Sequence, residues 1–163
     1  MAEIPIGFLE ETVIANTELF TVEGAGLYHF GVLSSAMHMV WVRSVCGRLE
    51  SRYRYSKDIV YNNFPWPEAL TDRNRKDIED AAQGVLDARA NFPDSSLADL
   101  YNLLTMPPEL VRAHQALDNA VDIAYSRRRF SGDGDRVSLL FNLYQQKIAP
   151  LDTGRRTRRT RKT

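Results

Sequence analysis

The run Phe64-Pro65-Trp66-Pro67 constrains the fold of this chain more than any other feature of its sequence. Proline has no backbone N–H and a fixed φ angle, and it disfavours helical angles at the residue before it. Two prolines separated by one residue therefore exclude both a helix and a central β-strand here. We expect a boundary at this run, with one unit at 1–67 and another at 68–154.

The first unit carries short runs of residues that favour strands. These runs lie at 4–9, 12–15, 19–22 and 53–61, and glycines at 24 and 26 predict a turn. One helix is expected from residue 32 to about residue 49, with Ser34 or Ser35 as its N-cap. The sequence thus predicts a small β-rich N-terminal part with one helix.

The second unit has the apolar spacing of helices throughout. A first helix is predicted from about residue 72, and a short one after Ser96, because Ser96 and Asp99 fit a capping box. Pro108 suits the first turn of a third helix, and a fourth is expected to begin at Asp133. The fold class predicted for the whole chain is α+β, with a mainly α-helical C-terminal subdomain.

Composition excludes several classes of protein. With 44% hydrophobic residues among 163, the chain has enough apolar surface for a folded core. No apolar run has the length of a membrane span, and the start of the chain has no secretory leader, so we expect a cytoplasmic protein without a membrane partner. Cys46 is the single cysteine, which excludes an intramolecular disulfide.

The net charge of zero conceals a basic tail. Residues 155–163 contain six basic residues and no acidic one, so the remainder has 15 basic and 21 acidic residues. A tail of this density repels itself, is expected to be disordered, and is attracted to phosphate backbones. The alternative is a solvated chain end with no partner.

The sequence holds no motif of a complete enzyme. It lacks a glycine-rich cofactor loop, a nucleophile elbow and a metalloprotease helix, so we expect no catalytic, cofactor-binding or metal-binding residue in this chain. Three residue groups have both a chemical and a structural interpretation, namely Cys46 with His29 or His38, His114 with Asp118, and Asp133 with Asp135. A buried thiol, a hydrogen bond and helix capping, respectively, explain them more simply.

A dense basic cluster lies just before the proline run. Its members are Arg43, Arg48, Arg52, Arg54 and Lys57, and Ser56, Asn62 and Asn63 lie beside it. Cations of this density suit phosphates, the interleaved tyrosines can pack on sugars or bases, and asparagine can read an adenine edge. The pattern fits nucleic acid, and the family resemblance given below implies that these eight residues bind DNA. In the alternative, the arginines pair with carboxylates such as Glu50 and Asp58, and the tyrosines belong to the core.

Longer strings of the sequence carry a family resemblance. They are 27–31 (LYHFG), 34–43 (SSAMHMVWVR), 47–49 (GRL), 54–56 (RYS), 60–67 (VYNNFPWP), 86–90 (LDARA), 97–101 (LADLY), 105–110 (TMPPEL) and 113–118 (AHQALD). In this order the strings resemble the C-terminal portion of MmeI-like DNA methyltransferases of bacterial restriction-modification systems. The resemblance covers nearly the whole chain apart from the basic tail.

The resemblance implies a large enzyme that transfers a methyl group from S-adenosylmethionine to the exocyclic amino group of adenine in double-stranded DNA. It identifies residues 1–67 with the end of a target-recognition domain and 68–154 with a helical C-terminal domain. The family's catalytic Asn-Pro-Pro-aromatic motif and its glycine-rich cofactor motif are both missing. The chain is therefore expected to be a fragment that is inactive alone and that works with a catalytic domain of the same polypeptide.

Two further expectations concern partners. A sheet edge exposed in the isolated fragment favours a dimer. A function of another class is also open, in which the chain is a non-catalytic helical protein-interaction or scaffold domain. Outward-facing arginines favour DNA binding, whereas arginines engaged in internal ion pairs favour the scaffold.

Overall fold

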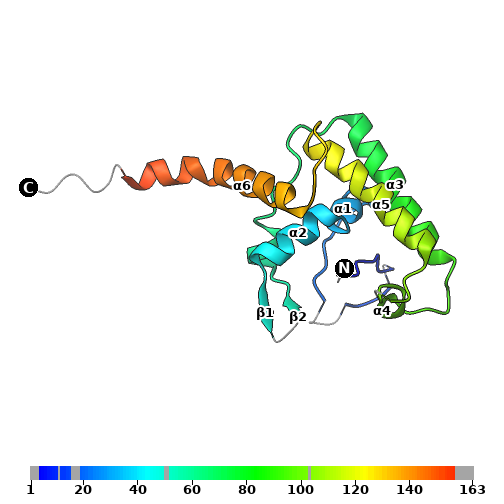
Figure 1. Ribbon diagram of the computed structural model, residues 1–163. Coiled ribbons are helices and arrows are strands. Elements are labelled where there is room, and N and C mark those ends of the chain that lie inside the picture. Colours follow the sequence, from blue (N-terminus) through cyan, green and yellow to red (C-terminus); the bar gives the residue numbers. More distant parts are fainter. Residues whose placement is uncertain (1–3, 11, 16–18, 50–51, 103, 157–163) are drawn as a thin grey trace, which may run out of the picture.

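A computed structural model describes the chain at 4–10, 12–15, 19–49, 52–102 and 104–156, with side chains described there except at 48, 49, 52–54 and 150–156. The elements, in chain order, are α1 (Leu27–Leu33), α2 (Ala36–Val45), β1 (Gly47–Leu49), β2 (Arg52–Arg54), the π-helix η1 (Lys57–Tyr61), α3 (Asp72–Ala90), α4 (Leu97–Leu100), α5 (Pro108–Tyr125) and α6 (Asp133–Arg156). Figure 1 shows their arrangement. The tail beyond residue 156 lies outside the described residues.

The prediction of a β-rich N-terminal part is wrong, because the regular elements of the described residues are helices apart from one small hairpin. Its strands β1 and β2 have three residues each and pair antiparallel, with Arg48 opposite Tyr53. The described residues of 4–22 form no strand. Strand propensity depends on a partner strand and a packed face, and here Ile4 and Ile6 pack on the core while Ile14 is 96% exposed.

The single helix predicted from residue 32 to residue 49 is also wrong. Two helices form instead, because the Ser35 hydroxyl accepts the His38 N–H at 3.4 Å and starts a new helix, α2. Of the strand predicted at 53–61, residues 53 and 54 lie in β2, but residues 57–61 form a helical turn, since the Ser56 hydroxyl caps the Ile59 N–H at 3.4 Å. Trp41 Nε1 then donates to the Val60 carbonyl at 3.0 Å and fixes this turn against α2.

The helices predicted for the second unit are confirmed. Thr71 caps α3 by accepting the Asn74 N–H at 3.1 Å, and Ser96 and Asp99 form the capping box of α4. The third helix begins at Pro108 and the fourth at Asp133. Side-chain capping thus sets the starts of α3 and α4, and a proline in the first turn marks the start of α5.

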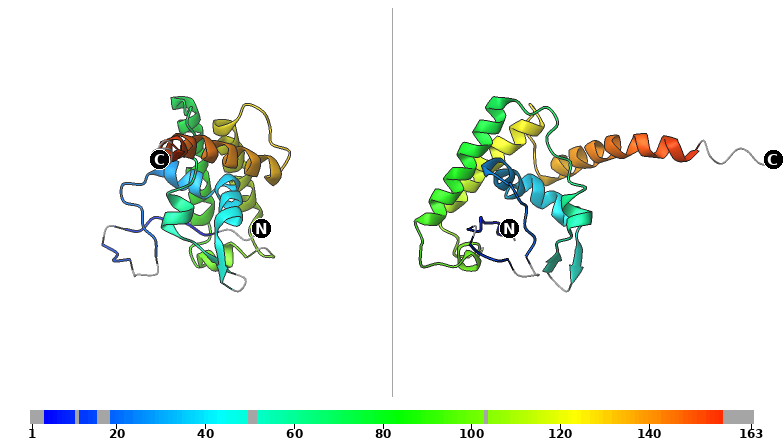
Figure 2. Two further views of the ribbon diagram at one scale, coloured as in Figure 1. Left: turned by 90° about the vertical axis from the view of Figure 1, so that its left-hand side faces the viewer. Right: turned by 180° about the vertical axis from the view of Figure 1, so that it is seen from behind.

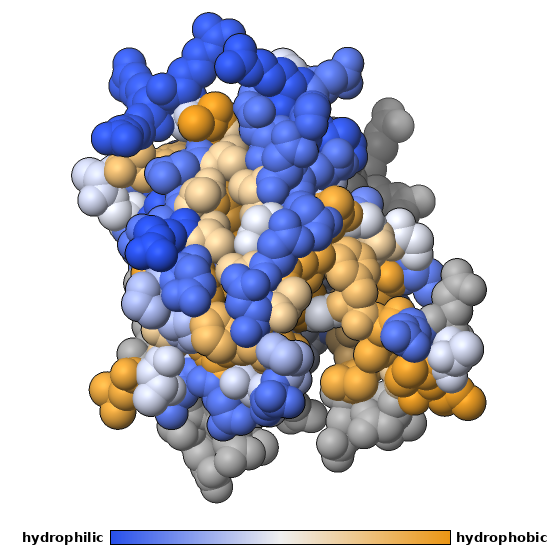
Figure 3. Space-filling model, turned by 90° about the vertical axis from the view of Figure 1, so that its right-hand side faces the viewer, coloured by the Kyte–Doolittle hydropathy of each residue, from blue (hydrophilic) through white to orange (hydrophobic). Residues whose placement is uncertain are grey.

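The core lies where α1 crosses α3 and α5, which run side by side in opposite directions (Figures 1 and 2). Ile78 of α3 and Leu117 of α5 are fully buried in it. Gly31 of α1 lies so close to α3 and α5 that a Cβ at this position would be 2.8 Å from Ile78 Cγ2 and 3.2 Å from Leu117 Cδ1. Only glycine lets α1 approach this closely. On the outer face of this region, hydrophilic side chains flank a strip of apolar ones (Figure 3).

The proline run packs against helices on both sides of the boundary expected there. Phe64 is 2% exposed, and its ring centroid lies 6.4 Å from that of Trp41 and 6.5 Å from that of Tyr125. The Tyr125 hydroxyl donates to the Pro65 carbonyl at 2.7 Å. The run therefore connects α2 to the end of α5.

Two features project from this body. The hairpin extends beyond the end of α2, and α6 leaves the body so that its C-terminal half stands apart from the other helices (Figures 1 and 2). The base of α6 is held by Trp41, whose ring centroid is 5.5 Å from that of Phe141 and 5.7 Å from that of Tyr144. Among the described residues, none of the helices combines the length and apolar character that a membrane crossing needs.

Candidate nucleic-acid interface

The predicted DNA-binding residues gather around the hairpin and the turn that follows it. Arg48 belongs to β1, and Arg52 and Arg54 are the ends of β2. The pairing places Arg54 opposite Gly47 and Arg52 opposite Leu49, so three arginines share two strands of three residues. The side chains of these arginines lie outside the described part of the structure.

The other polar candidates lie at the two ends of η1. Lys57 is exposed at its first turn, and Ser56 caps it. Asn62 Nδ2 donates to the Asp58 carboxylate at 3.2 Å, while Asn63 Nδ2 donates to the backbone carbonyls of Asp58 and Ile59 at 2.6 and 3.1 Å. Ser56, Asn62 and Asn63 therefore already serve to shape this turn.

A cavity of about 400 Å³ lies at the base of the hairpin and is lined by residues on both sides of it, namely Cys46, Gly47, Tyr55, Ser56, Ile59 and Val60. Behind it, the Tyr55 hydroxyl and His38 Nε2 are 3.1 Å apart. Burial lowers the pKa of His38 to about 3 and raises the pKa of Tyr55. Burial also raises the pKa of the Cys46 thiol. A neutral histidine and a protonated thiol suit packing under the hairpin rather than nucleophilic catalysis.

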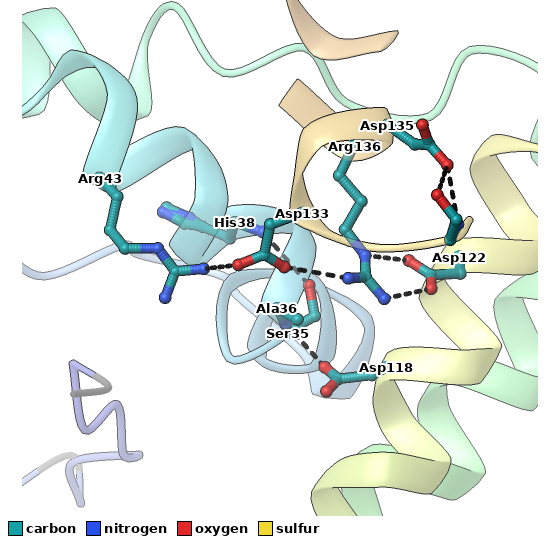
Figure 4. A network of polar contacts seen from close by, with 10 residues as sticks. Ser35, Ala36, His38, Arg43, Asp118, Asp122, Asp133, Asp135 and Arg136 are labelled. Carbon is teal, nitrogen blue, oxygen red and sulfur yellow. Dashed lines mark hydrogen bonds and ion pairs between the residues drawn. The ribbon is translucent and has the colours of Figure 1, made fainter. Parts of the chain in front are cut away.

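Arg43 occupies a different setting from the hairpin arginines. Its guanidinium pairs with the Asp133 carboxylate at 2.8 Å, and Asp133 also accepts from Arg136 at 3.1 Å (Figure 4). Arg136 in turn donates to both oxygens of Asp122, at 2.9 and 2.6 Å. This chain of ion pairs joins α2 to α6 and α6 to α5, so Arg43 holds helices together.

Asp118 of α5 adds a further contact to this region. Its Oδ1 accepts the Ala36 N–H at 2.7 Å, at the first turn of α2. Burial raises the pKa of Asp118 to about 6, although the Ala36 N–H and Arg136 act in the opposite direction. We call Arg43, Asp118, Asp122, Asp133 and Arg136 the charged junction.

The remaining histidine and aspartate candidates have structural contacts. His29 Nδ1 accepts the Gly26 N–H at 3.2 Å at the start of α1, and Asp135 accepts from both the backbone and the hydroxyl of Ser131 at 2.7 Å. His114 Nε2 lies 2.6 Å from the Tyr101 hydroxyl. Burial, with Arg89 nearby, lowers the pKa of His114 to about 4. The described residues contain no cluster of three or more side chains suited to a metal ion.

Sequence reasoning gave Arg43, Asp118 and Asp133 other roles and did not identify Asp122 or Arg136, so it missed the charged junction as a unit. Asp122, Asp133 and Arg136 come from two helices of the second unit, and Arg43 lies 90 residues before Asp133. No local pattern links residues so far apart. The sequence analysis also did not consider Arg127, Arg128 and Arg129, although three consecutive arginines are directly visible in the sequence.

Comparison with known proteins gives consistent results. The chain matches the family described as "MmeI, target recognition domain" over residues 3–68 and the family described as "MmeI, C-terminal domain" over residues 69–152. It is 42% identical over 143 residues to DNA methyltransferase A of Bacillus subtilis (strain 168), which covers 88% of this chain and 16% of that protein.

A solved structure is similar as well. The type IIL restriction-modification enzyme MmeI in complex with DNA matches with a TM-score of 0.73 and 48% identity, covering 77% of this chain and 17% of that one. The chain thus spans less than a fifth of the length of each of these relatives.

Proposed function

Because the chain belongs to the MmeI family, across its target recognition and C-terminal domains, we propose that it is the DNA-recognition segment of a bacterial restriction-modification DNA methyltransferase. The observation that carries this proposal is the match of residues 3–68 to a target recognition domain, in the region that contains the basic hairpin. The relative in complex with DNA supports duplex DNA as the ligand.

In this proposal the two units divide the work. Residues 1–67 present the DNA-contacting groups, with Arg48, Arg52, Arg54 and Lys57 on phosphates and Ser56, Asn62 and Asn63 near the DNA. Residues 68–154 form the helical support, and Arg43 connects the two through Asp133 at 2.8 Å. Phosphate contacts of this kind set the register of the protein on the duplex.

Methyl transfer from S-adenosylmethionine to adenine belongs, in our proposal, to a catalytic domain outside these 163 residues. The residues present do not fit the cofactor. Gly24, with φ of 67°, turns the chain into α1, yet the described residues before it contain no strand, and a strand–loop–helix cofactor site requires one. The segment contributes positioning of the duplex.

Fluorescence anisotropy with a duplex at two salt concentrations tests the proposal. The intact chain is expected to bind in the range of roughly 10⁻⁴ to 10⁻⁶ M near physiological salt. The hairpin variant Arg48→Gln, Arg52→Gln, Arg54→Gln is expected to weaken binding by at least about tenfold and to reduce the salt slope by about 2 to 3, since each lost phosphate contact removes about 0.9.

A matched control removes three exposed cations elsewhere, by Arg73→Gln, Lys76→Gln and Arg112→Gln. It is expected to change affinity by no more than about threefold, because only the net charge is altered. An intact, folded chain that shows no salt-dependent binding would contradict the proposal and favour a scaffold role. Equal losses in the two variants would show attraction by net charge without a DNA-binding hairpin.

A further inference from the structure

We infer that the loop between α5 and α6 is a second surface for the phosphate backbone of duplex DNA, through Arg127, Arg128 and Arg129. We call these three residues the arginine loop. This inference rests on the proposed function, because it extends DNA contact from the first unit to the helical unit. The arginine loop lies outside the hairpin, between α5 and α6.

The arginine loop differs from other exposed cations of the molecule. All three side chains are exposed, and the described residues provide them with no ion pair. On α3, by contrast, Lys76 lies 2.8 Å from Asp80, and Arg73 and Arg75 each have a carboxylate at 3.9 Å. Three adjacent guanidiniums without counter-charges raise the local potential and attract a polyanion.

The backbone of the loop is held at both ends. The Ser126 hydroxyl accepts the Arg128 N–H at 3.0 Å, and Asp135 accepts from the Ser131 N–H and hydroxyl at 2.7 Å. Between them, the Arg136 guanidinium lies 5.8 Å from the centre of the Phe130 ring. The arginines therefore extend from an ordered segment, and less entropy is lost when they bind than from a free chain.

The charged junction connects this loop to the hairpin. Asp133 follows the loop directly and pairs with Arg43, which lies in the last turn of α2, just before β1. Arg136, which packs on Phe130, also pairs with Asp122 at 2.6 Å. The start of α6, which follows the loop, is thus paired with α2, which precedes the hairpin (Figure 4).

The two basic surfaces stand at different edges of the body. In the left view of Figure 2 the loop, in dark yellow, and the hairpin, in cyan, both border the side from which α6 projects. A duplex is stiff over this scale, so one that touches both surfaces has to run along this side. Arginine suits the contact, since its planar guanidinium can donate two hydrogen bonds to one phosphate.

The variant Arg127→Gln, Arg128→Gln, Arg129→Gln tests this inference in the same anisotropy assay. At about 0.1 M salt its dissociation constant is expected to rise by between about tenfold and a few hundredfold, with a salt slope lower by about 2 to 3. The change should be the same for duplexes of unrelated sequence, because phosphates carry no sequence information. The control is again Arg73→Gln, Lys76→Gln, Arg112→Gln.

The outcomes separate this inference from the proposed function. If the hairpin variant loses affinity while the arginine-loop variant matches the control, the second surface is refuted and the recognition role remains. If the intact chain does not bind DNA, the proposed function fails first. Additive losses in a variant that combines the hairpin and loop changes support two separate contacts.

A second measurement locates the loop on DNA without removing three charges. In a chain with Cys46→Ser, a cysteine is introduced by Arg128→Cys and labelled with an iron chelate that cleaves nearby DNA strands. Cleavage is expected from this position and not from Gln83→Cys, which lies on an exposed part of α3. Equal cleavage from both positions, or none from position 128 with a chain that still binds, overturns the inference.

Discussion

The molecule contains two helix junctions that differ in their share of charged contacts. Where α1 crosses α3 and α5, the contact is apolar, with Leu117, Ile78 and Val121 fully buried. Where α2 meets α5 and α6, the aromatic contacts of Trp41 with Phe141 and Tyr144 are joined by a network of charged side chains, namely Arg43, Asp133, Arg136, Asp122 and Asp118. The first junction removes apolar surface from water, whereas the second pairs charges that water would also have stabilised.

This difference teaches that stability and orientation have separate sources here. Apolar burial contributes free energy with little directional preference. Buried ion pairs contribute little net stability, because desolvation offsets attraction, but they require particular geometry. The apolar junction therefore holds the fold together, and the charged junction sets how α2, and the hairpin that follows it, sits against α6.

The largest expected effect is at the apolar junction. Leu117→Ala should lower the free energy of unfolding by about 3 kcal/mol, from the lost transfer energy and the cavity left behind. Urea unfolding followed by circular dichroism measures it. Ile123→Ala on the same helix, at a side chain 60% exposed, is the control and should cost less than about 1 kcal/mol. Similar losses at the two positions would remove the basis of the comparison.

The next effect is a pH dependence at the charged junction. In the folded chain Asp118 keeps its proton up to a pKa of about 6, against an ordinary value of 3.8. The folded state thus binds the extra proton between these values, so the contribution of this group to stability falls as the pH rises through this window. Asp118→Asn keeps an acceptor for the Ala36 N–H and removes the charge.

The free energy of unfolding of Asp118→Asn, relative to that of the unaltered chain, should increase by up to about 3 kcal/mol as the pH rises from 4 to 7.5. Unfolding in urea at each pH gives the difference, in which His38 and His114 cancel because both proteins contain them. Arg136, Asp122 and Asp133 are the charged groups that face Asp118. For Asp94→Asn, at an exposed loop position, the difference in the free energy of unfolding from the unaltered chain should not change with pH. If the difference for Asp118→Asn is also independent of pH, burial does not destabilise the charged form of the Asp118 carboxylate.

The smallest effect is the coupling between Arg136 and Asp122, whose side chains are each 16% exposed. A double-mutant cycle with Arg136→Met and Asp122→Asn should give about 1 to 2 kcal/mol, since two hydrogen bonds join largely buried charges. The matching cycle at Lys76 and Asp80, exposed by 71% and 65%, should give about 0.5 kcal/mol or less. Equal couplings would mean that the charged junction is no more specific than a surface pair.

The sequence predicts those parts of the fold that depend on neighbouring residues. Thr71, Ser96 and Pro108 announce helix starts within a few residues, and each helix begins there. The strand predicted at 53–61 ends after residue 54, and the rest of the prediction fails because contacts with a distant part of the chain decide the structure there. Tyr55 bonds to His38 and the Val60 carbonyl bonds to Trp41, and both partners lie on α2. Such contacts override local propensity.

In the candidate site, too, local features are predictable from the sequence and tertiary contacts are not. The basic cluster is visible as a sequence pattern, and the family strings identify its context. The pattern cannot distinguish Arg43 from Arg48, because the carboxylate that pairs with Arg43 is 90 residues away. Likewise, Ser56 and Asn63 have side chains suited to DNA, yet their contacts with the Ile59 N–H and carbonyl also shape the turn.

Both ends of α2 are held by carboxylates from other helices, Asp118 at its start and Asp133 near its end. The strands β1 and β2 follow beyond this support. In evolutionary terms, a substitution in the strands acts at a distance from both carboxylates, so its effect on folding is expected to add independently to theirs. The strand residues that we propose for DNA contact can then diversify while α2 stays in place, which separates the inheritance of a stable fold from the inheritance of DNA affinity.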